Sequence, residues 1–250
     1  MLKQPKDWII PDWPAPARVR AIITTRDGGC SIGSYASLNL GLQVGDDEAS
    51  VLTNRRIVKQ FLPAEPKWLN QVHGTRVMPA ESIAIPVEAD ASFASRPGCV
   101  CVVLIADCLP ILICERTGAI VAVAHAGWRG LVSGIIESTV RALQTQPQDL
   151  IAYLGPAIGP SVFEVGSDVR DCFVAADSAA QYAFQRNNAG KWCADLFALA
   201  RQRLVQLGVT DVYGGGLCTY ADSARFFSHR REKPTGRMAA LIWIDDQSPA

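Results

Sequence analysis

The stretch that decides the expected fold is residues 99–130, which run CVCVVLIADCLPILICERTGAIVAVAHAGWRG. Three segments within it have strand-like composition and are apolar on both faces, namely residues 100–105, 111–114 and 120–124. Because Asp107 and Pro110 interrupt residues 99–114, this part falls short of the ~20 apolar residues that cross a bilayer. The pattern predicts paired core strands in a sheet that is covered on both faces.

Helices and further strands flank this stretch in both directions. Helical spacing predicts helices at residues 131–143, at residues 195–207 and between Asp46 and Pro63. Strand-like composition predicts strands at residues 18–25, 68–72, 151–154, 211–213 and 238–244. This order is mixed α/β without a strict strand–helix–strand repeat, and no compositional boundary divides it. We therefore expect a single α/β domain over residues 1–250, built on mixed sheets.

One surface of the first helix is expected to face solvent. Its apolar residues lie on one stripe, and Arg55, Arg56 and Lys59 lie on the other side. Charged side chains on the face opposite an apolar stripe are normally hydrated, so these three residues are predicted to be exposed.

The charge balance and the N-terminus narrow the function classes. Lys and Arg number 24 and Asp and Glu also 24, so the zero formal net charge does not indicate a nucleic-acid or membrane partner. Prolines and aspartates interrupt the N-terminal MLKQPKDWIIPDWP before an export signal forms, which predicts a cytoplasmic protein with reduced cysteines. Small neutral or modestly charged molecules are the expected ligands, and nothing in the sequence indicates an oligomeric state.

Three residues form a candidate metal site. The chain has three histidines, and two of them, His73 and His125, lie in Gly-flanked segments at predicted strand ends. Cys108 likewise follows an apolar strand where that strand ends. Two imidazole nitrogens and a thiolate suit Zn²⁺, and three protein ligands leave a fourth position for water or substrate. Spacing alone is equally compatible with a buried cysteine and two unrelated histidines, because no close ligand pair is present.

Several spaced motifs together resemble one known family. They are TTRDGG, SLNLG, NQVHG, ADCLPILI, AHAGWRG, SHRR and TGR, which run in order from Thr24 to Arg237. This set resembles the YfiH, or laccase-domain, family and covers nearly the whole chain. The resemblance implies a layered α/β/β/α sandwich, similar to the cytotoxic necrotizing factor deamidase domain, with zinc at His73, Cys108 and His125.

The same resemblance implies a reaction on purine nucleosides. It indicates phosphorolysis of adenosine, inosine and methylthioadenosine, accompanied by adenosine deamination, with nucleoside and phosphate as partners. His73, Cys108, His125 and Arg129 are the expected catalytic residues. Arg129 stands at the start of a predicted helix, where backbone N–H groups and the helix dipole attract anions, so it is the leading phosphate contact.

Other polar residues in the motifs are weaker candidates. Arg26, Arg230 and Arg237 are candidate substrate-binding residues, although a surface salt bridge would account for each equally well. His229 is a candidate general base and Asp107 a candidate partner of a metal ligand. Asn39 and Gln71 are equally suited to binding substrate and to satisfying loop backbone groups, which leaves both readings open.

Competing functions use the same residues. The family's former description as polyphenol oxidase suggests copper, which a His₂Cys set can hold, but three histidines cannot build a multicopper centre. A metal-free hydrolase with Cys108 as nucleophile and His125 as base is the second alternative. Editing of peptidoglycan precursors and a structural zinc site in a binding protein also stay open.

Overall fold

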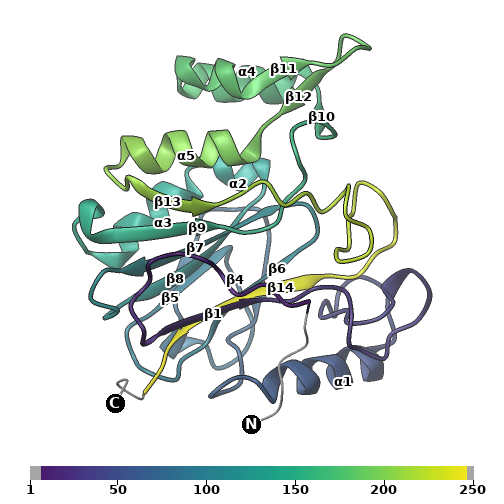
Figure 1. Cartoon of the computed structure of the whole chain (residues 1–250), viewed down its shortest axis with the longest axis vertical. Coiled ribbons are helices and arrows are strands. Elements are labelled where there is room, and N and C mark those ends of the chain that lie inside the picture. Colours follow the sequence, from purple (N-terminus) through teal and green to yellow (C-terminus); the bar gives the residue numbers. More distant parts are fainter. Residues whose placement is uncertain (1–6, 247–250) are drawn as a thin grey trace.

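The computed structural model of the protein describes residues 7–246. Part of the N-terminal segment from which the absence of an export signal was predicted therefore lies outside the described residues. Figure 1 shows layers stacked along the long axis of the molecule. Helices α2, α3 and α5 cover one sheet, a second sheet lies beneath it, and helix α1 closes the opposite side. This arrangement confirms the expected α/β/β/α sandwich.

The larger sheet has six strands and is mixed. Its order is β13 (Asp211–Gly214), β9 (Leu150–Leu154), β7 (Leu109–Glu115), β8 (Val121–Ala126), β5 (Ala91–Ala94) and β3 (Val77–Pro79). The two outer pairs are parallel and the inner pairs antiparallel. Strand β8 is buried at every position, as its apolar run predicted, because layers cover both faces of the sheet.

The smaller sheet corrects one expectation. It consists of β1 (Val19–Ile23), β14 (Met238–Ile244) and β6 (Cys101–Ile105), with β14 antiparallel to both neighbours. Residues 99–114 were expected to form paired strands, but β6 and β7 belong to different sheets. The chain changes direction between β6 and β7 at Asp107, which has a positive φ of 87°. This turn leads the chain from the small sheet to the large sheet.

The helices follow their predicted spacing with two differences. They are α1 (Glu48–Lys59), α2 (Trp128–Ser133), α3 (Ile135–Leu143), α4 (Ser167–Ala176) and α5 (Leu196–Gln206). Side chains of Asp47 and Asp195 cap α1 and α5, accepting from the N–H groups of Ser50 and Ala198. The single helix expected over residues 131–143 is broken, because Gly134 has a left-handed conformation with φ 98°.

The second difference concerns the polar side of α1. Arg56 is exposed as predicted, but Arg55 and Lys59 are only half-exposed. The guanidinium of Arg55 lies against Trp68. The prediction that this residue faces solvent was therefore wrong, because a loop and an aromatic side chain cover that part of the helix.

Short elements complete the structure. The strand expected at residues 68–72 is limited to β2 (Leu69–Asn70), which pairs with β4 (Val87–Glu88). A small sheet of β10 (Glu164–Val165), β12 (Trp192–Ala194) and β11 (Phe184–Arg186), together with α4, was not expected from the sequence. The 3₁₀ turns are η1 (Gly33–Tyr35), η2 (Ala80–Ser82), η3 (Pro147–Asp149) and η4 (Ser178–Ala183).

Apolar cores hold the layers together. One packs α3 and α5 on the large sheet, one lies between the two sheets, and one lies between the small sheet and α1. Within residues 7–246, no helix is both long and apolar enough to span a bilayer.

Truncation of Leu112 tests the packing between the sheets. Leu112 on β7 is fully buried in the core between the sheets, so Leu112→Ala should lower the free energy of unfolding by about 2–5 kcal/mol. Leu52→Ala, on the outer side of α1 with 37% of Leu52 exposed, is the matched control and should change it by about 0.5 kcal/mol or less. Urea unfolding followed by circular dichroism measures both, and equal effects would contradict the assigned layers.

Candidate metal centre and substrate cavity

The three predicted ligands converge at one point. Ligand atoms of His73, Cys108 and His125 all lie within 4.8 Å of one another. The Cys108 Sγ is 3.7 Å from His73 Nε2, and the two imidazole rings meet edge to face with centroids 4.8 Å apart. His125 is buried, Cys108 is half-buried and His73 is exposed, so the cluster opens to solvent on the His73 side.

Each ligand comes from a different element. Cys108 lies in the reversal after β6, as expected, and His73 follows the short β2 with a positive φ of 59°. His125 was expected just beyond a strand, but it lies inside β8, opposite Pro110 of β7. Strand β8 therefore fixes the His125 backbone directly, and the two loops bring the other ligands to it.

A buried carboxylate that the sequence analysis did not single out orders the centre. Asp90 Oδ1 lies 2.8 Å from His125 Nδ1. The same side chain accepts from the backbone N–H groups of Val72, His73 and Gly74 at 3.1, 2.9 and 2.7 Å. Asp90 thus fixes both the His125 ring and the loop that carries His73, which is the usual task of a carboxylate behind a metal-binding histidine.

The electrostatics of the cluster favour a thiolate. Burial alone would raise the pKa of the Cys108 thiol, but the His125 and His73 imidazoles outweigh it and lower the pKa to about 6. Burial would lower the pKa of His125, whereas the Cys108 thiolate and the Asp90 carboxylate raise it to about 9. Cysteine binds metals as the thiolate, so the cluster holds this ligand in its binding form at neutral pH.

The residues present fit a metal ion. Asp90 is hydrogen-bonded to Nδ1 of His125, so Nε2 is the nitrogen of that ring that remains to bind a metal ion. Two nitrogens and one sulfur would hold the ion, and the cavity that these residues line would give a small molecule access to it.

The backbone at position 127 lies so close to Cys108 and His73 that a glycine is required there. A Cβ added there would lie 2.9 Å from both Cys108 Sγ and His73 Cδ2, closer than side-chain atoms normally approach. Gly127 directly follows β8 and precedes α2, so the backbone itself forms one wall of the centre.

A cavity of about 510 Å³ lies over the centre and contains most of the predicted site residues. Its wall includes the three ligands, Asp107, Gln71 and His229, and the arginines Arg55, Arg129, Arg230 and Arg237. None of these four guanidiniums makes an ion pair with a carboxylate in residues 7–246. The cavity is therefore strongly cationic, although the whole chain has no net charge.

Three arginines of the motifs line the cavity, and they differ in exposure and in the contacts that their guanidiniums make. Arg129 is exposed and lies over the Trp128 ring at 4.5 Å. Arg230 donates to the Glu164 carbonyl at 3.0 Å. Arg237 is half-buried and donates to the carbonyls of Thr235 and Gly236 at 2.9 and 3.0 Å.

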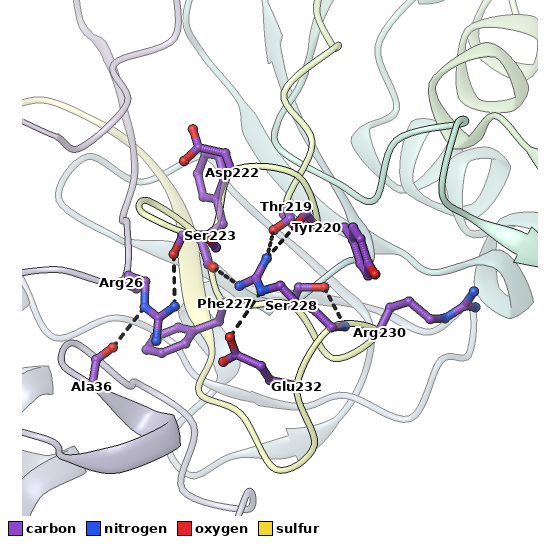
Figure 2. A network of polar contacts seen from close by, with 12 residues as sticks. Arg26, Ala36, Thr219, Tyr220, Asp222, Ser223, Phe227, Ser228, Arg230 and Glu232 are labelled. Carbon is purple, nitrogen blue, oxygen red and sulfur yellow. Dashed lines mark hydrogen bonds and ion pairs between the residues drawn. The ribbon is translucent and has the colours of Figure 1, made fainter.

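Arg26 lies elsewhere. Figure 2 shows its guanidinium donating to the carbonyls of Ala36 and Ser223, both at 3.0 Å, and it also stacks on Phe227. It does not appear in the cavity wall formed by the described residues. Arg26 joins the loop after β1 to the loop before β14, and Arg231 stabilises the second loop by donating to the carbonyls of Thr219, Tyr220 and Phe226.

The remaining motif residues bind the protein's own backbone. Asp107 accepts from Thr219 Oγ1 and from the Arg230 backbone N–H, both at 2.6 Å, and so positions the loop that carries His229. Gln71 exchanges two hydrogen bonds with the backbone of Leu104. Asn39 is buried and accepts from the Arg237 backbone N–H at 2.8 Å.

Comparison with known proteins shows the family of the chain. A family model described as multi-copper polyphenol oxidoreductase laccase matches residues 20–245. The chain belongs to this family. A Pseudomonas aeruginosa member named purine nucleoside phosphorylase is 52% identical over 240 residues, covering 96% of this chain and 99% of the relative. The Escherichia coli member, purine nucleoside phosphorylase YfiH, is 48% identical and covers 94% and 98%.

Solved members of the family have the same fold. A Neisseria meningitidis protein aligns with a TM-score of 0.93 at 49% identity, covering 96% of this chain and all of that one. YlmD from Geobacillus stearothermophilus aligns with a TM-score of 0.87 at 31% identity, covering 98% of both chains. The layered architecture is therefore shared with both of these solved proteins.

Substitution of Asp90 tests how the centre is ordered. In Asp90→Asn an amide nitrogen replaces one of two accepting oxygens, and because each oxygen accepts from two N–H groups, two N–H groups lose their acceptor. We expect metal affinity to fall about 10- to 100-fold. Competition against a chromophoric chelator measures this, with Asp171→Asn on the exposed side of α4 as the control. An unchanged affinity would contradict the role of Asp90.

A pair of glycine substitutions tests the crowding at the centre. Gly127→Ala should lose most of the bound metal, because its Cβ would displace Cys108 and His73. Gly74→Ala is the matched control, since its Cβ would meet Asp90 Oδ2 and Val72 Cγ2 at an ordinary 3.5 Å. Metal per chain is measured by plasma mass spectrometry on folded protein. Equal metal content in both variants would show that Gly127 is not required.

Proposed function

We propose that the protein is a purine nucleoside phosphorylase that binds its metal at His73, Cys108 and His125. The observation that carries this proposal is the cavity, which joins the three-ligand cluster to four guanidiniums that form no ion pair with a carboxylate of residues 7–246. Phosphate is an anionic substrate, and arginine binds it well because its planar fork matches two phosphate oxygens. The names of the relatives at 52% and 48% identity supply the substrate class.

In this reaction a phosphate oxygen attacks C1′ of the ribose and the bond from C1′ to the purine nitrogen breaks. The products are ribose 1-phosphate and the free base, which takes a proton at the released nitrogen. Arg129, Arg230 and Arg237 are the proposed phosphate contacts, because they line the cavity. Arg26 is left in a structural role, since its guanidinium donates to loop carbonyls outside the cavity wall.

Arg237 is the best placed of these arginines. Burial lowers the pKa of its guanidinium, while the negative charges of Cys108 and Asp107 raise it. Arg237 also lines the same cavity as the three metal ligands. An anion bound there would lie between the cluster and the arginine, where it would be held during attack on C1′.

Zinc is the proposed metal. The donor set of two imidazoles and one thiolate fits Zn²⁺, and the ion would supply Lewis-acid activation of a substrate oxygen or of water. Copper is the alternative that the family description suggests, but the chain's three histidines are too few for a multicopper cluster. The accompanying deamination of adenosine would take place in the same cavity, with oxygen from water replacing the amino group at C6 of adenine and ammonia and inosine as the products.

A second candidate function has its own structural support. Asp90, His125 and Cys108 stand in the order of a carboxylate, imidazole and thiol triad, in which the carboxylate orients the base and the base activates the nucleophile. This arrangement suits a metal-free hydrolase, for which peptidoglycan precursors are one substrate class. Such an enzyme would keep its activity after chelation, whereas the proposed phosphorylase would lose it.

Metal content and turnover of the native protein and Cys108→Ala separate these functions. We expect about one zinc per chain, adenine from adenosine only when phosphate is added, and loss of both metal and turnover in the variant. Cys172→Ala, at an exposed cysteine, is the control. Chromatography resolves adenine from inosine, and inosine formed without phosphate measures deamination.

Two other results of the same experiment would contradict the phosphorylase function. Turnover that survives chelation, together with alkylation of Cys108, would favour the hydrolase. Bound zinc with neither product would overturn the nucleoside proposal.

A further inference from the structure

Arg55 and Trp68 form a rigid pair in the cavity wall that the proposed reaction does not yet use. The Arg55 Cζ lies 3.7 Å from the centroid of the Trp68 ring, so the guanidinium stacks on the indole. Arg55 Nε donates to the Leu40 carbonyl at 3.0 Å, and Trp68 Nε1 donates to Glu65 Oε1 at 3.1 Å. Both planar groups are thus held in fixed orientations.

The outer edge of this guanidinium is free. Among residues 7–246, neither terminal nitrogen of Arg55 has a hydrogen-bond partner. Arg55 and Trp68 both line the cavity. Burial lowers the pKa of Arg55 to about 10, so the group remains a cation at neutral pH. It therefore presents two coplanar donors to a ligand.

Arg55 and Arg237 have different charged neighbours, since Arg237 interacts with Cys108 and Asp107 of the centre whereas Arg55 interacts with Glu65. Arg237 couples electrostatically to Cys108, and its backbone carbonyl accepts from Leu40 N–H at 3.0 Å. The Leu40 carbonyl in turn accepts from Arg55, so this short segment separates the two arginines. Phosphate and C1′ belong at the Arg237 side under the proposed function, which leaves the Arg55 side for the part of the substrate farthest from them.

We propose that Arg55 recognises the purine base and makes the enzyme prefer 6-oxopurine nucleosides, such as inosine, over adenosine. This inference rests on the proposed phosphorylase function. The terminal nitrogens of arginine match two neighbouring acceptors, and a 6-oxopurine offers O6 and N7 in that arrangement. Adenine offers N7 and an amino donor instead, which opposes one of the two guanidinium donors.

The substitution Arg55→Gln tests this assignment. A glutamine amide has one donor and one acceptor, which matches the adenine edge rather than the 6-oxopurine edge. We expect the ratio of kcat/KM for inosine to kcat/KM for adenosine to fall at least about 5-fold, with KM for phosphate unchanged. Arg56→Gln, one residue along α1 and exposed, is the matched control and should leave the ratio as it is.

Arg55→Lys separates base recognition from phosphate binding. Lysine keeps the charge but lacks the fork, so it should lower the ratio as well if Arg55 recognises the base. A phosphate contact would behave differently, because a point charge retains much of phosphate binding and the glutamine variant alone would raise KM for phosphate. Equal losses for both nucleosides, or a raised KM for phosphate in Arg55→Gln, would overturn the proposal.

Binding of free bases keeps this test separate from the proposed reaction. Calorimetry with hypoxanthine and adenine should show tighter hypoxanthine binding to the native protein and a lost or reversed preference in Arg55→Gln. Thermal unfolding checks that each variant is folded, and Arg55→Lys replaces Arg55→Gln if the latter is not. Absence of phosphate-dependent turnover would refute the phosphorylase function, whereas equal binding of the two bases to the native protein would refute the role of Arg55.

Discussion

The hydrogen bond from the His125 ring to the Asp90 carboxylate is the interaction on which the rest of the site depends. Asp90 is completely buried and precedes β5, while its backbone carbonyl also accepts from the His125 N–H at 2.7 Å. A buried carboxylate must have donors, and here they come from the imidazole and from the loop that carries His73. Satisfying this one charge therefore brings two metal ligands into position.

Much of the layered fold follows from patterns in the sequence. Apolar runs on both faces located β6, β7 and β8, and helical spacing located α1 and α5, since these signals are local. The assignment of β6 and β7 to separate sheets depends on the backbone angle at Asp107 and on a distant strand, β14, that pairs with β6. Such long-range pairing leaves no mark within a short window of sequence.

The site was predictable where residue chemistry is distinctive. Two histidines and a cysteine after apolar segments indicated the cluster, and the arginines of the late motifs indicated most of the cationic wall. Asp90 was missed because an aspartate before a strand is typical of an ordinary turn. Arg55 was missed because its place on the polar side of a helix indicates solvent, and only the tertiary structure shows Trp68 covering it.

The order of the small sheet has a consequence for how the chain is made. Strand β14, close to the end of the chain, lies between β1 and β6 and is the neighbour to which both are hydrogen-bonded. During synthesis from the N-terminus, β1 and β6 leave the ribosome long before the strand that joins them. A nascent chain that stops before Met238 therefore carries two unpaired strand edges, which are exposed to wrong partners until translation is complete.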